Sequence, residues 1–255
     1  MKPISNNALI GYPAGIITGI TYGLNPLFGM PLMSKGVSVD SILFFRYGIA
    51  VLILGAILLF DRQSFKISWR QAGVLLVLGL LYTSSSICLF EAYKYIPSGL
   101  ATTLIFLYPV LVALIMVFLR VVPSWQVWLA IVATFVGVII MTQGDSSQEI
   151  NPIGVLLSLG SALVYALFIV IINRSKTIGD ISNSLLTFYA LSVGAVIFFV
   201  RTAISGGDIM AGIDSNMDWF NLVGLAILPT IVSTATLAIA GICSHVSASG
   251  ATLIS

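Results

Sequence analysis

Two charged residues lie within long apolar stretches of the sequence and could bind or transfer a charged group. Arg46 follows the aromatic pair Phe44-Phe45 near the start of one stretch, and Glu91 lies at the end of the next. An arginine at a bilayer centre costs about 2.5–3.5 kcal/mol, and a side chain that extends to the membrane surface avoids most of that cost. Arg46 therefore either extends outward or faces a cavity and binds an anionic group. Glu91 could pair with Arg46, pair with Lys94 or carry a proton.

Hydroxyl residues gather within two of the apolar stretches, at Thr83–Ser86 and at Ser233–Thr236. Hydroxyl groups that line a cavity could hydrogen-bond to a polar solute. Small hydroxyl residues also let neighbouring helices approach closely, so packing is the alternative interpretation. The candidate substrate contacts in these clusters are Ser84, Ser85, Ser233 and Thr234.

Prolines interrupt several of the stretches, and polar residues lie near them. The prolines are Pro13, Pro26, Pro109 and Pro229. Each removes a helical hydrogen bond and could kink or hinge its helix. Asn25 precedes Pro26 and could satisfy or exploit the carbonyls that the proline releases. Tyr22 and Tyr165 could contact a substrate, or could pack with their hydroxyl groups hydrogen-bonded.

The elements that must position these residues are membrane-spanning helices. Of 255 residues, 58% are hydrophobic and 8% are charged, whereas soluble domains carry about 25% charged residues. A span needs about 20 apolar residues, and its backbone must satisfy its own hydrogen bonds. The stretches are continuous rather than alternating, which excludes a β-barrel. The predicted fold class is an all-α integral membrane protein.

Eight spans are predicted, and Ser247–Ser255 would begin a ninth. They cover Gly11–Met33, Ile42–Phe60, Ala72–Ala92, Pro97–Leu119, Trp125–Met141, Pro152–Ile172, Leu185–Ile204 and Trp219–Ile242. If the N-terminus is cytoplasmic, most lysines and arginines outside the spans lie on the cytoplasmic side, as the positive-inside rule requires. We therefore expect a multi-pass protein of the inner (plasma) membrane with a cytoplasmic N-terminus.

Enzymatic and nucleic-acid-binding signatures are missing from the sequence. It has no phosphate-binding glycine loop, zinc signature or catalytic triad, and Cys88 and Cys243 lack metal-ligand spacing. The net charge of +2 comes without a basic cluster. We expect no cofactor, no metal, no nucleic-acid partner and no enzymatic activity.

The two halves of the sequence are related. A shift of 143 residues aligns Tyr22 with Tyr165, and a later shift of 150 aligns Leu75 with Leu225. The repeat unit has five spans, and because five is odd the second copy enters the membrane inverted. We expect one repeat at 1–145 (spans one to five) and a second at 150–255 (spans six to eight and the start of nine). The complete fold would have ten helices, of which about eight and a half are present, so the second repeat is truncated.

Several motifs resemble the EamA-like branch of the drug/metabolite transporter superfamily. They are Phe44-Phe45-Arg46-Tyr47, the hairpin Glu91–Ala101, Tyr108-Pro109, Gly137 in the fifth span and the start of a ninth span at His245–Ser255. The sequence departs from the family at Arg120–Pro123, where a glutamate is common, and in lacking the rest of span nine and all of span ten.

The resemblance implies a secondary permease that moves a small polar metabolite, an amino acid or related compound, across the inner membrane by alternating access. Efflux is the expected direction, and a coupled proton and a homodimer stay open. The expected partners are the small-molecule substrate and the lipid bilayer. Two alternatives remain: a nonfunctional fragment or structural membrane subunit, and a membrane-embedded enzyme, against which the lack of His, Asp or Cys clusters within the spans argues.

Overall fold

The structure is a computed structural model that describes residues 6–119, 132, 151–237 and 239. Its regular elements in these ranges are all helical, which confirms the all-α prediction. The helices are α1 (Asn6–Gly23), α2 (Asn25–Ser34), α3 (Val39–Phe60), α4 (Trp69–Ala92), α5 (Ser98–Ile105), α6 (Tyr108–Phe118), α8 (Pro152–Arg174), α9 (Asn183–Ile204) and α10 (Asn216–Ala226), with a 3₁₀ turn at Lys176–Ile178 and a π-helix, η2, at Ile227–Val232.

Six helical segments of the described chain are long and apolar enough to cross a membrane. One of them, Asn216–Leu237, joins α10, η2 and a final helical turn, and is called span eight below. Apart from Val132, the predicted span Trp125–Met141 lies outside the described residues, as does Ser247–Ser255.

Side-chain caps fix where several helices begin. Ser38, Ser68, Ser182 and Ser215 each accept a hydrogen bond from a backbone N–H in the first turn of α3, α4, α9 and α10. At Ser68 and Ser215 the residue three positions on returns a bond to the capping serine's N–H, which completes a capping box. These four helices therefore start at defined residues.

Three predicted spans are interrupted. The first divides at Leu24 into α1 and α2, the fourth divides at Phe106-Leu107 into α5 and α6, and span eight passes through η2. A proline lies at each interruption, namely Pro26, Pro109 and Pro229. The loss of the proline N–H accounts for these positions.

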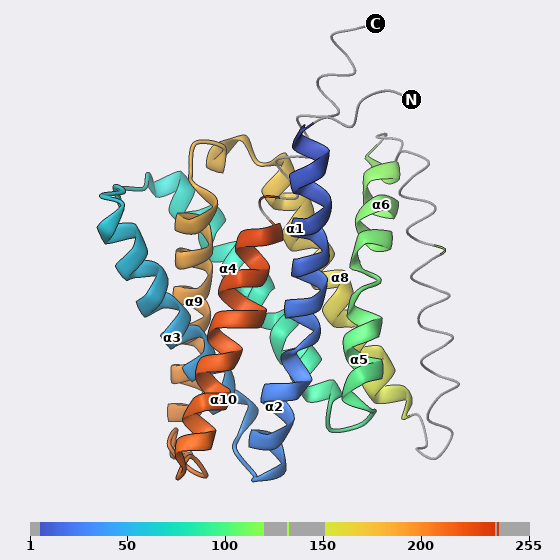
Figure 1. Cartoon of the computed structure of the whole chain (residues 1–255), viewed down its shortest axis with the longest axis vertical. Coiled ribbons are helices and arrows are strands. Elements are labelled where there is room, and N and C mark those ends of the chain that lie inside the picture. The colour runs from blue at the N-terminus through green and yellow to red at the C-terminus, as the bar shows by residue number, and fades with distance from the viewer. Residues whose placement is uncertain (1–5, 120–131, 133–150, 238, 240–255) are drawn as a thin grey trace, which may run out of the picture.

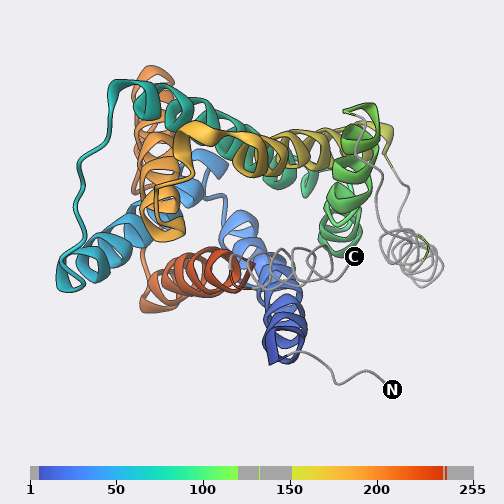
Figure 2. The ribbon, with the colours of Figure 1, turned by 90° about the horizontal axis from the view of Figure 1, so that it is seen from above.

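The helices form a bundle in which distant parts of the sequence lie side by side (Figures 1 and 2). Helix α3 packs along α9, α4 packs against α8 and α9, and span eight packs against α1, α2 and α3. In Figure 1, α8 runs upward whereas α1 runs downward, and α9 likewise runs opposite to α3. The buried core lies where these helices meet.

Close helix contact in this core depends on glycine. A Cβ atom added to Gly194 of α9 would collide with the ring of Tyr47 from α3 and lie 2.7 Å from Thr83 Oγ1 of α4. Gly194 thus allows α3, α4 and α9 to meet at one level of the bundle.

We predict that Gly194→Ala lowers the thermal stability of the detergent-solubilised protein, because overpacking costs about 1–3 kcal/mol. Gly160→Ala in α8 is the matched control, since nothing lies within 4 Å of its added Cβ. Equal melting temperatures for the two variants would contradict the packing account.

Candidate functional site

The interruption of the first span is stabilised by Asn25. Pro26 deprives the carbonyl of Tyr22, four residues earlier, of its helical N–H donor. The side-chain Nδ2 of Asn25 donates to that oxygen over 2.8 Å, as the sequence suggested. The amide oxygen Oδ1 of the fully buried Asn25 has no hydrogen-bond partner within the described part of the chain, so these residues leave one acceptor unsatisfied at the break.

In span eight, a hydroxyl group hydrogen-bonds to the carbonyl that a proline leaves without a donor. Pro229 leaves the carbonyl of Leu225 without its N–H donor, and the hydroxyl of Thr230 donates to that oxygen over 2.9 Å. Thr230 is fully buried and lies within η2. Both breaks are thus stabilised by the residue next to the proline.

Arg46 points into the bundle and is 1% exposed. Its Nε donates to Thr230 Oγ1 over 2.7 Å. The carbon at the centre of its guanidinium lies 5.9 Å from the ring centre of Tyr47 and 5.8 Å from that of Phe90. The side chain therefore does not extend to the membrane surface, and it connects α3 with α4 and span eight.

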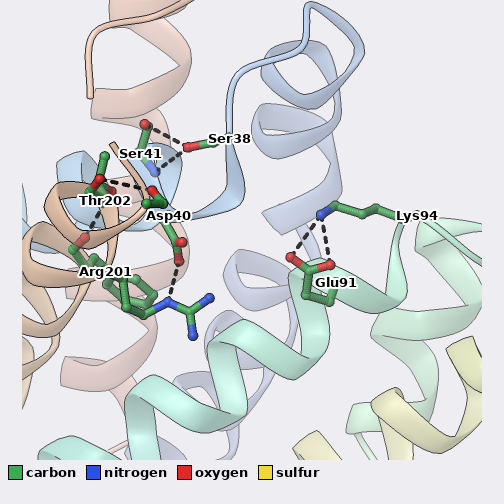
Figure 3. Close-up of polar contacts among 9 residues, drawn as sticks. Ser38, Asp40, Ser41, Glu91, Lys94, Arg201 and Thr202 are labelled. Atoms are coloured by element: carbon green, nitrogen blue, oxygen red, sulfur yellow. Dashed lines mark hydrogen bonds and ion pairs between the residues drawn. The ribbon is translucent and has the colours of Figure 1, made fainter. Parts of the chain in front are cut away.

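No carboxylate pairs with Arg46 among the described residues. Glu91 pairs with Lys94 at 2.8 Å instead, as Figure 3 shows. The other ion pairs of the described chain join Lys35 to Asp218 and Asp40 to Arg201. Arg46 is thus a buried cation whose described neighbours are the hydroxyl groups of Thr230 and Tyr82 and the rings of Tyr47 and Phe90.

A cluster of aromatic residues joins two of the interrupted spans. The ring of Tyr22 lies 5.8 Å from that of Phe106, which lies in the break between α5 and α6. Tyr165 of α8 contacts Tyr22 at 6.4 Å and Tyr108 at 4.8 Å between ring centres. Tyr22 and Tyr108 are half-buried, whereas Tyr165 is buried. Two of the candidate residues, Tyr22 and Tyr165, are therefore in contact.

The hydroxyl cluster of α4 divides between two faces. Ser85 is buried and exchanges hydrogen bonds with Ser161 of α8, including a 2.7 Å bond from Ser161 Oγ to the Ser85 carbonyl. Ser84 is exposed on the outer side of α4, in line with Leu76, Val77 and Leu80, and its hydroxyl bonds to the Leu80 carbonyl. Ser85 thus joins two helices, and Ser84 faces away from Arg46.

The hydroxyl cluster of span eight lies beyond the π-helix. Ser233 is buried, and Thr234 donates to the carbonyl of Thr230 over 2.6 Å. Thr236 shares a 2.7 Å hydroxyl contact with Thr18 of α1. Thr234 also lines a groove of about 270 Å³ between α3, α9 and span eight, whose other lining residues are Leu54, Asn183, Ser184, Thr187, Ile231, Ala235 and Ile239.

Sequence reasoning missed Thr230, which contacts Arg46 directly. Its position next to Pro229 was the available signal, because Asn25 beside Pro26 was singled out on that ground. Tyr108, which lies in the aromatic cluster, also follows a break and precedes a proline. No group of three potential metal ligands occurs among the described residues.

The six long apolar helices of the described chain are those of a multi-pass membrane protein. The chain belongs to the EamA-like transporter family, whose sequence profile matches residues 9–143. A solved structure described only as "Crystal structure of protein" has the same fold, with a TM-score of 0.66 and 18% identity over 90% of this chain and 78% of the other. No curated protein sequence matches.

We predict that, in a variant without native cysteines, Thr234→Cys reacts with a membrane-impermeant thiol reagent whereas Ser85→Cys does not. Thr234 lines the groove, and Ser85 is 2% exposed and bonded to Ser161. Labelling rates measured by mass spectrometry test this, and rapid labelling at Ser85 would show that α4 and α8 separate there.

Proposed function

We propose that the protein is a secondary transporter for a small polar metabolite that carries an anionic group, and that Arg46 binds this group. The observation that carries the proposal is the burial of Arg46 without a carboxylate partner in the described chain. A buried charge without a counter-charge is strongly unfavourable. An anionic substrate supplies the missing charge and hydrogen-bond acceptors.

Discontinuous spans at the site support a transport role. Transporters commonly bind substrates where membrane helices are broken near the bilayer midplane. Here the break of the first span lies beside Tyr22, the break of the fourth contacts Tyr22 through Phe106, and the π-helix of span eight carries Thr230. Tyr22, Tyr165 and Asn25 supply aromatic surface and an unsatisfied acceptor for the remainder of the substrate.

The contacts between helices support an inverted repeat of 1–145 and 150–255. In the proposed repeat, α4 is equivalent to span eight, and α8 is equivalent to the first span, α1 and α2. Helix α4 packs on α8, and span eight packs on α1 and α2 in the same way. The hydroxyl pairs obey the same exchange: Thr18 corresponds to Ser161 under the shift of 143, and Thr236 corresponds to Ser86, the neighbour of Ser85. Tyr22 and Tyr165, also equivalent, touch each other as residues near a two-fold axis would.

The two ends of the bundle differ, which supports alternating access. At the end where α2 meets α10, Lys35 pairs with the buried Asp218 at 2.6 Å. Asp40 pairs with Arg201 at 3.0 Å (Figure 3), so two ion pairs link the proposed repeats. The opposite end carries the groove lined by Thr234. We infer that this conformation is closed at the ion-paired end.

Charge and the family support the rest of the proposal. The exposed residues Arg62, Lys66, Arg70 and Arg174 lie at the groove end, which favours a cytoplasmic groove and N-terminus in the inner membrane. The substrate is then an amino acid or related compound taken up from the cytoplasm for efflux. The same proposal includes coupling of transport to protons and assembly of the protein as a homodimer.

We predict that Arg46→Ala lowers transport of an L-amino-acid mixture by proteoliposomes at least about thirtyfold, because truncating a buried charged partner costs about 2–5 kcal/mol. Arg174→Ala, at the exposed end of α8, is the control and keeps normal transport. Normal transport by Arg46→Ala, in protein of normal yield and melting temperature, would overturn the proposed role of Arg46.

We also predict that Lys35→Glu opens the ion-paired end, because a second carboxylate repels Asp218. Losing an ion pair with an exposed lysine is worth about 1 kcal/mol, and the added repulsion acts in the same direction, so labelling of Asn221→Cys by an impermeant thiol reagent rises about fivefold or more. Lys94→Glu is the matched control, since Lys94 is equally exposed and its one ion pair in the described chain is with Glu91, three residues earlier. Equal labelling in both variants would exclude Lys35 from closure.

A further inference from the structure

The hydroxyl of Thr230 makes two hydrogen bonds with different structural consequences. It donates its one proton to the Leu225 carbonyl over 2.9 Å, and its oxygen accepts from Arg46 Nε over 2.7 Å. The first bond holds the backbone of span eight together across Pro229, and the second ties that point to α3. Because a hydroxyl has a single donor, its direction is fixed by these two partners.

Thr230 lies where span eight can bend. Proline and π-helical geometry are common causes of helix kinks, and both occur within Ile227–Val232. Before this segment, α10 packs against α2 and α3 and carries Asp218 of the ion-paired end. After it, Thr236 contacts Thr18 of α1, and Thr234 lines the groove. The Arg46–Thr230 bond therefore braces the junction between the two parts of span eight.

We propose that Thr230 is a positioning residue that couples anion binding at Arg46 to bending of span eight at η2. The inference rests on the proposed function, in which Arg46 binds the anionic group of the substrate. Carboxylates and phosphates bind a guanidinium through two parallel N–H groups. When that pair includes Nε, the anion takes the hydrogen bond that Thr230 accepts in this structure.

As a consequence, the Arg46–Thr230 hydrogen bond breaks while the helical hydrogen bonds of span eight remain. Thr230 keeps its bond to the Leu225 carbonyl, so the backbone at Pro229 stays satisfied, while the link to α3 is lost. A ligand shifts a conformational equilibrium only by its differential affinity for the two states. The anion binds the unbraced state more tightly, because there it does not compete with Thr230 for Nε.

Thr230→Val tests the coupling, since valine keeps the shape and removes the hydroxyl group. Competition for Nε disappears, so KM for the L-amino-acid mixture falls about threefold to tenfold. Turnover also falls, by at least about fivefold, because binding no longer drives the bend. Thr230→Ser keeps both bonds and restores both parameters. A purely structural role would lower stability and turnover without lowering KM.

Hydrogen exchange of the unmodified protein gives a second readout that does not depend on the folding of a variant. Adding the L-amino-acid mixture should speed amide exchange at 225–234, whereas the control segment of α4 at 74–84 stays unchanged.

The outcomes separate this proposal from the proposed function. Normal transport by Arg46→Ala overturns the anion site and the coupling together. Loss of transport in Arg46→Ala, combined with unchanged KM and turnover in Thr230→Val, overturns the coupling alone. Unchanged or slower exchange at 225–234 in the presence of a transported mixture also overturns it.

Discussion

A guanidinium buried among membrane helices requires hydrogen-bond acceptors and aromatic rings around it, and this constrains how the neighbouring helices pack. At 1% exposure the guanidinium of Arg46 does not reach water. Its hydrogen bond to Thr230 therefore substitutes for part of its hydration, and the rings of Tyr47 and Phe90 supply a weaker cation–π attraction. These contacts come from α3, α4 and span eight, so the charge draws three helices to one point. Gly194 permits that approach, because any side chain there would displace Tyr47.

The prolines belong to the same arrangement. In lipid, a carbonyl released by proline must find another donor within the protein. Asn25 donates a hydrogen bond to the carbonyl left without a donor by Pro26, and Thr230 donates one to the carbonyl left without a donor by Pro229. Each of these hydrogen bonds requires a polar side chain in the bundle interior. A continuous helix would not require one there. The breaks and the polar residues near them are therefore one structural feature, and Thr230 links it to the charge of Arg46.

The sequence was sufficient for features set by local chemistry. Span positions follow from apolar length, and the role of Asn25 follows from its place before Pro26. The direction in which each side chain points was harder to predict. A membrane helix is apolar on all sides, so its sequence pattern does not distinguish the face toward lipid from the face toward the protein interior. Ser84 and Ser85 show this: adjacent hydroxyl residues, one exposed and one bonded to Ser161. Likewise, the Arg46–Thr230 contact joins residues 184 positions apart, which no local spacing could indicate.

Span eight relates the two ends of the bundle. It carries Asp218 at the ion-paired end, Thr230 at the bend and Thr234 in the groove, in that order along one helix. From Thr230 to Thr234 is about one helical turn, or roughly 6 Å, so a change at the bend acts directly on the groove wall. The lower part is held through Lys35 and the upper part through Thr18. Thr18 lies in α1 and Lys35 directly follows α2, so the two partners lie on opposite sides of the break at Leu24, just as the two parts of span eight lie on opposite sides of η2.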